Sequence, residues 1–167
     1  MNILQVTPFF KPVWESGGVA RVAYDISRNL HENGHAVTVY TTNRSIYPSD
    51  LPTNRPTDVD GMNVYYFENL RRYIPGATPP VIPYRMPAVA KRETARFDVI
   101  HIHDHRTLLT VIASHYARKY GVPYVLQALN TPTSLPAAGS AQHGVSMTPR
   151  RSCSTSGDST RQKGSIS

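Results

Sequence analysis

The chain has a single cysteine, Cys153, among its 167 residues. One cysteine cannot form a disulfide within the chain, which excludes a disulfide-stabilised fold and favours a reducing compartment. Cys153 stands in a Ser-rich stretch with no apolar sequence around it to build a pocket. We therefore do not expect it to act as a nucleophile.

Long apolar runs and several catalytic motifs are also missing. No run of about 18 apolar residues occurs, and the N-terminus lacks the basic and apolar regions of a signal peptide. We expect a cytoplasmic protein, with any membrane contact peripheral. The absence of a P-loop, a G-x-S-x-G elbow and a Cys-x-x-Cys pair removes support for the chemistry that those motifs carry.

Acidic residues are few, with 11 Asp and Glu against 18 Lys and Arg and a net charge of +7. A basic chain raises nucleic acid as a partner. Residues 129–167 hold 4 basic and 1 acidic residue, so this short segment carries +3 of the excess. It shows no aromatic residues interleaved with Arg and no known nucleic-acid signature, so we expect a solvated basic tail and no nucleic-acid partner.

Up to about Ala128, strand-like and helix-like segments alternate. The expected strands are Asn2–Val6, His35–Thr41, Met62–Phe67, Phe97–Ile102 and Pro123–Gln127. The first expected helix begins at Gly17-Gly18 and ends before Gly34. Two further helices are expected over Ala88–Arg96 and Thr107–Tyr120. Two connections are expected to be loops. Asn43–Asp60 is rich in Pro, Thr, Asn and Asp, and Arg71–Pro87 contains five prolines. This alternation predicts an α/β fold with a Rossmann-like doubly wound parallel sheet.

Helical spacing of apolar residues predicts the buried face of two helices. In the first helix these residues are Val19, Val22, Ala23, Ile26 and Leu30. In the last helix they are Leu108, Val111, Ile112, His115 and Tyr116.

The composition changes abruptly after Ala128. Among residues 129–167, 14 of 39 are Ser or Thr and none is Phe, Tyr or Trp. Such a segment cannot bury enough surface to offset its ordering entropy, so we expect one domain over residues 1–128 and a disordered tail over 129–167. Because the change follows a strand where a helix should come, our hypothesis is that the tail is out of frame or a terminal fragment unrelated to the fold.

The Gly17-Gly18 pair stands between the first strand and the first helix. Backbone amides at a helix start favour anions, so the pair can face a phosphate. It can equally serve only the tight entry into the helix, since glycine tolerates a positive φ. The pattern is not G-x-G-x-x-G, and both interpretations stay open.

A histidine cluster, His101, His103 and His105, follows the fourth expected strand. Alternation places these side chains on one face while the strand lasts. The cluster lacks the spacing of the known metallo-hydrolase motifs, so we expect no metal. Asp104 with His103 or His105 can form an acid–base pair, because imidazole titrates near neutral pH. Alternatively, Asp104 or His105 caps the following helix.

Four segments, in this order, resemble the N-terminal domain of the family 4 glycosyltransferases, which are retaining enzymes of the GT-B fold. They are Pro8–Arg21 with its Gly-Gly pair, Asn33–Val39, Asp60–Val64 and Asp98–Asp104, which is similar to a "DVIHxH" motif. The resemblance extends from Met1 to about Ala128 and implies that the chain forms one half of a GT-B fold.

The resemblance also implies roles for particular residues. Gly17 and Gly18 would meet the phosphates of a nucleotide-sugar donor, which acts as a co-substrate, so that no separate cofactor is expected. His103 and Asp104 would contact a hydroxyl of a glycan, lipid or small-molecule acceptor. Arg21 would help with an anionic acceptor, or is simply an exposed arginine.

Two departures from the family pattern limit these roles. The family usually has a histidine shortly after the strand that corresponds to Tyr124–Gln127, and residues 127–130 contain no histidine. The second domain, which would bind the nucleotide and stabilise the leaving diphosphate, is missing from these 167 residues. We therefore expect a truncated chain without transferase activity of its own. The alternative is a non-enzymatic Rossmann-like module that binds a ligand or partner.

Overall fold

The computed structural model describes residues 1–14, 17–43, 51–69 and 81–128. The expected disorder of the tail lies outside these residues, as do residues 44–50 and 71–80 of the two expected loops. The division into residues 1–128 and 129–167 stays a prediction.

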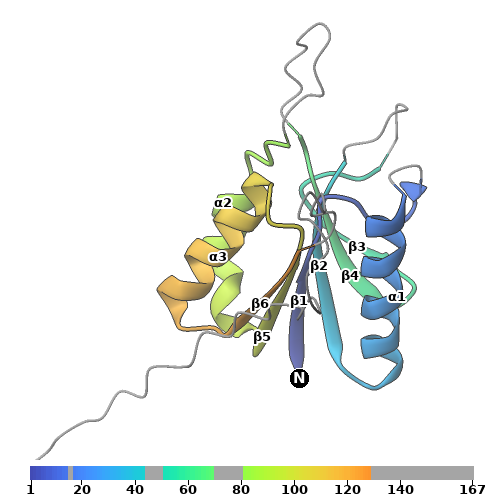
Figure 1. Ribbon diagram of the computed structural model, residues 1–167, viewed down its shortest axis with the longest axis horizontal. Helices are drawn as coiled ribbons and strands as arrows, with labels where there is room; N and C mark the ends of the chain where they lie inside the picture. Colours follow the sequence, from blue (N-terminus) through green and yellow to red (C-terminus); the bar gives the residue numbers. More distant parts are fainter. Residues whose placement is uncertain (15–16, 44–50, 70–80, 129–167) are drawn as a thin grey trace, which may run out of the picture.

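A six-stranded sheet in the order β3-β4-β2-β1-β5-β6 forms the centre of the fold (Figure 1). The strands are β1 (Asn2–Val6), β2 (Ala36–Thr42), β3 (Pro56–Val59), β4 (Met62–Phe67), β5 (Val99–His103) and β6 (Tyr124–Gln127). Among them, β3 runs antiparallel to β4, and all other neighbouring pairs are parallel. The predicted parallel α/β sheet is confirmed.

Helices cover both faces of this sheet, as expected for a doubly wound fold. Figure 1 shows α1 (Gly18–Glu32) on one side, and α2 (Met86–Glu93) and α3 (Leu108–Tyr120) on the other. A short 3-10 turn, η2 (Thr94–Arg96), follows α2. None of the helices in the described ranges is long and apolar enough to span a lipid bilayer.

Each face of the sheet has its own apolar core. Beneath α2 and α3 the buried side chains include Leu4, Tyr40, Phe67, Met86, Ile100, Ile102 and Leu109. On the α1 face they include Phe10, Val37, Val39, Met62, Val64 and Tyr66. Because α1 packs on β2 and β4, the apolar core on its face lies over that half of the sheet.

The buried face of α1 is only partly as predicted. Ala23 is buried, Val19, Ile26 and Leu30 are half-buried, and Val22 is exposed. The fully buried positions include two small residues, Ala20 and Ser27. Their size lets the helix lie close to the sheet, and the Ser27 hydroxyl is satisfied because it donates to the Ala23 carbonyl at 2.7 Å.

The predicted face of α3 is wrong for three of its five residues. Leu108, Val111 and His115 are exposed, whereas Ile112 is buried and Tyr116 is half-buried. The sheet side of the helix carries Leu109, Ile112, Ala113 and Ala117. Apolar residues stand on both sides of this helix, so their spacing alone could not decide which side packs.

Strand β3 is missing from the prediction, because Pro56 and Asp58 made its segment resemble a loop. An edge strand tolerates both residues, since one side of its backbone needs no partner. The Asp60-Gly61 turn into β4 is confirmed, with φ of 53° and 83°. Glycine is favoured at position 61 by its positive φ, and a Cβ atom there would lie 2.6 Å from Nε2 of His31, so the imidazole would have to move.

Candidate functional site at the carboxyl edge of the sheet

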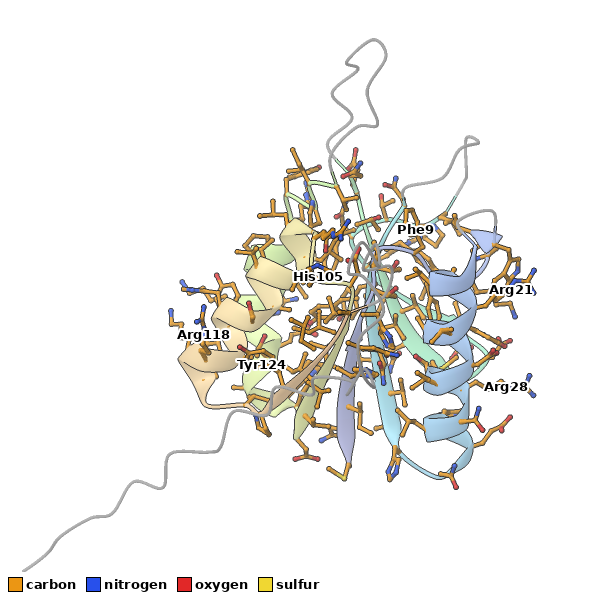
Figure 2. The ribbon with its side chains drawn as sticks, in the orientation of Figure 1. Phe9, Arg21, Arg28, His105, Arg118 and Tyr124 are labelled. Atoms are coloured by element: carbon orange, nitrogen blue, oxygen red, sulfur yellow. The ribbon has the colours of Figure 1, made fainter. Side chains whose placement is uncertain are left out.

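The candidate site lies where β1 meets β5. From β1 the chain moves to β2 on one side, and after β4 it returns to β5 on the other side of β1. Such a switch in strand order is where open α/β sheets bind ligands, at the carboxyl ends of the strands. Phe9, from the loop after β1, and His105, from the loop after β5, both lie at this edge (Figure 2).

Polar side chains from three neighbouring strands meet on one face at this edge. The Nε2 atom of His103, a residue only 1% exposed, lies 2.7 Å from Oε1 of the fully buried Gln5. The His103 ring centroid is 4.1 Å from that of His101. Gln127 stands opposite His103 in the register of β5 and β6. The predicted site residue His103 is therefore packed between glutamines of both adjacent strands.

Three polar atoms of this cluster lack a hydrogen-bond partner within the described part of the chain. They are Gln5 Nε2, His103 Nδ1 and Gln127 Oε1. Buried polar atoms are nearly always paired in native proteins. Unpaired buried atoms on three adjacent strands therefore make this place the candidate for a functional role.

The pKa of His103 is lowered to about 3, mainly by burial and to a smaller extent by the neighbouring His101, while the Gln127 carboxamide acts in the opposite direction. Burial also lowers the pKa of His101. Both imidazoles are neutral at physiological pH, so His103 lacks the near-neutral titration on which the acid–base hypothesis rests.

Asp104 follows directly after β5 in a left-handed conformation with φ of 86°. Such a φ is uncommon for a residue other than glycine, and strained backbone of this kind clusters at functional sites. Its Oδ1 accepts a hydrogen bond from the Arg106 amide at 3.2 Å. The cap of α3 is Thr107, whose hydroxyl accepts from the Thr110 amide, so the prediction that Asp104 or His105 caps this helix is wrong.

Gly17 and Gly18 lie at the start of α1. Gly17 is the N-cap residue with φ of 78° and ψ of −146°, a conformation that essentially only glycine adopts. Gly18 has no positive φ, and a Cβ atom at either position would meet nothing within 4 Å. The turn interpretation therefore accounts for Gly17 but gives no reason for a glycine at position 18.

The loop between β1 and α1 is held by contacts with β4 and with the turn that precedes β4. Its Phe10 side chain is fully buried. Lys11 forms a 2.8 Å ion pair with Asp60, which also accepts from the Tyr24 hydroxyl at 2.6 Å. The Tyr66 hydroxyl donates to the Lys11 carbonyl. These contacts fix the backbone that leads to the glycine pair.

Arg21 does not join the polar cluster. Its side chain is exposed, with its guanidinium 5.8 Å from the centroid of the Trp14 ring. Figure 2 shows Arg21 on the outer side of α1, away from the sheet. The predicted site residues therefore fall into three places, with the glycine pair at the helix start, His103 and Asp104 at the end of β5, and Arg21 on the outer surface.

Gln5 and Gln127 are not among the residues that the sequence predicts for the site. A signal was present for Gln5, since it is the polar residue in the otherwise apolar run Ile3–Val6.

In the described residues, no three His, Cys, Asp or Glu side chains are grouped so that they could hold a metal ion.

A comparison with known protein families supports the resemblance drawn from the motifs. The model of the family described as Glycosyltransferase Family 4 matches residues 16–131, which is more than half of the chain and includes all five predicted site residues. No curated protein matches the chain.

Proposed function

Because the chain belongs to glycosyltransferase family 4, we propose that it forms the acceptor-side half of a retaining enzyme. This enzyme moves a sugar from a nucleotide-sugar donor to a hydroxyl of a glycan, lipid or small-molecule acceptor. It acts in the cytoplasm, with peripheral membrane contact where the acceptor is a lipid.

The observation that supports this function best is the neutral polar cluster at the switch point between β1 and β5. The imidazole of His103 is neutral, so it has one acceptor nitrogen and one N–H donor, and either can form a hydrogen bond with a hydroxyl. Asp104 offers a half-buried carboxylate beside it in sequence. We assign these two residues to the acceptor, and the helix start at Gly17 and Gly18 to the donor diphosphate. The Gly17 amide donates to the Trp14 carbonyl at 3.1 Å, so the Gly18 amide is the one assigned to the phosphates.

Sugar transfer breaks the bond between the anomeric carbon and the diphosphate oxygen and forms one to the acceptor oxygen. Negative charge develops on the leaving diphosphate, and fixed positive groups must stabilise it. The polar cluster holds no cation, and Arg21 lies on the outer side of α1. We therefore propose that these 167 residues alone do not transfer sugar.

Ligand-detected NMR on the purified chain tests the acceptor assignment. The probes are methyl glycosides and uncharged polyols, with sugar phosphates as anionic counterparts. We expect saturation transfer to an uncharged hydroxyl compound, its loss in His103→Ala, and its retention in Arg21→Ala. If no hydroxyl compound binds, or if binding survives His103→Ala, the assignment is wrong.

A transfer assay tests the second part of the proposal. The chain is incubated with each probe and a panel of nucleotide sugars, and products are sought by mass spectrometry. We expect none. A glycosylated product that disappears in His103→Ala would show that this half can catalyse transfer by itself.

A further inference from the structure

The contact between Gln5 and His103 determines where the imidazole carries its hydrogen. Oxygen Oε1 of Gln5 can only accept, so the 2.7 Å contact requires a hydrogen on His103 Nε2. The ring is neutral, because burial holds its pKa far below the physiological range. A neutral imidazole has one N–H, so Nδ1 bears a lone pair and acts as an acceptor.

We propose that Gln5 is a positioning residue that holds His103 as the Nε2–H tautomer and so presents Nδ1 as a hydrogen-bond acceptor to a hydroxyl group. The role of Nδ1 toward an acceptor hydroxyl rests on the proposed function. The tautomer itself rests only on the geometry of Gln5 and His103.

The position of Gln5 suits this role. Strand β1 is hydrogen-bonded to β2 on one side and to β5 on the other, so its backbone is fixed. Gln5 is paired in register with His101, and its side chain is fully buried. A buried carboxamide on a central strand keeps its orientation, and the imidazole that it contacts keeps its orientation too.

The unpaired atoms of the cluster indicate which ligand chemistry fits. His103 Nδ1 and Gln127 Oε1 are acceptors, and Gln5 Nε2 is a donor. A hydroxyl group both donates and accepts, so hydroxyls can pair with all three atoms. A phosphate dianion or a carboxylate only accepts, and it would leave both acceptor atoms unpaired. The donor and acceptor atoms of the cluster therefore suit hydroxyl groups, each of which donates one hydrogen, better than an anion.

NMR of the whole 15N-labelled chain tests the tautomer directly. Long-range correlations between ring hydrogens and ring nitrogens show which nitrogen is protonated, and a His103→Gln sample assigns the signals. We expect the Nε2–H form with a visible Hε2 signal that exchanges slowly with water, because it is buried and bonded to Gln5. An Nδ1–H form in the unsubstituted chain would overturn the proposal.

Three variants separate positioning from mere packing. Gln5→Met has a similar length but no oxygen, so the slow-exchanging Hε2 signal should disappear and the Nδ1–H form should gain population. Gln5→Glu restores an acceptor, and the Hε2 signal should return further downfield. Gln127→Met, the matched control, removes the other carboxamide and should leave Hε2 in place.

An Hε2 signal that is unchanged in Gln5→Met would show that Gln5 only fills space, and the proposal would fail. If Gln5→Met does not fold, the unsubstituted chain and Gln5→Glu still decide between the two tautomers. These spectra are recorded without sugar. A confirmed tautomer in a chain that binds no hydroxyl compound would therefore contradict the proposed function and leave the role of Gln5 intact.

Discussion

Gly17 and Gly18 are adjacent in the chain, but their backbones adopt different conformations. Gly17→Ala should destabilise the fold by about 1–3 kcal/mol, because φ of 78° with ψ of −146° is a conformation open essentially to glycine alone. Gly18→Ala is the matched control. Position 18 is helical and open, so alanine should leave stability unchanged or raise it by up to about 1 kcal/mol. Urea denaturation measures both, and equal losses would contradict this account.

His103 should make stability depend on pH. Its pKa is about 3 in the folded chain against a usual value of 6.5, so between these values the unfolded state binds the additional proton. Stability is therefore complete above pH 6.5 and falls as the pH drops toward 3, with a slope that approaches about 1.4 kcal/mol per pH unit for this site.

The slope is best measured by urea denaturation between pH 6.5 and 5, before most carboxylates titrate. His103→Gln should flatten the profile, although His101, whose pKa is also lowered, retains part of the slope. His115→Gln replaces an exposed histidine and should leave the slope unchanged. An identical profile in His103→Gln would show that this imidazole is not buried in its neutral form.

At the scale of the element, the two sides of α3 differ sharply although both are apolar. Val111 is 59% exposed and the adjacent Ile112 is 9% exposed. Ile112→Ala should cost about 2–5 kcal/mol, because it leaves a cavity beneath the helix. Val111→Ala should change stability by less than about 0.5 kcal/mol. Thermal and urea unfolding measure both variants. Similar losses in the free energy of unfolding would show that Val111 is part of the core, as helical spacing alone predicts.

Apart from β3, the order and type of the elements could be predicted, whereas the side chains that meet could not. Buried strands such as β2 and β5 are short apolar runs between clear breakers, and Gly121 marks the end of α3 with φ of 68°. The contact between Gln5 and His103 joins residues 98 positions apart. It depends on β5 lying beside β1, which is a property of topology that no local pattern encodes.

At the scale of the whole molecule, the sheet divides at β1 into two halves that serve different ends of the proposed site. On one side, α1 and the loop before it carry the glycine pair, and the contacts of Phe10 and Asp60 anchor that loop. On the other side, β5 and β6 carry His103 and Gln127. The two halves meet along β1, so Gln5 belongs to the strand that both share.

Removal of residues 129–167 tests whether the fold is complete without them. The six strands and three helices of the described residues lie before residue 129, and the removed segment has no Phe, Tyr or Trp. A 1–128 chain should therefore keep its circular dichroism and unfold with a free energy within about 0.5 kcal/mol of the full chain. A large loss of stability would mean that residues 129–167 pack on the domain, and the predicted boundary would be wrong.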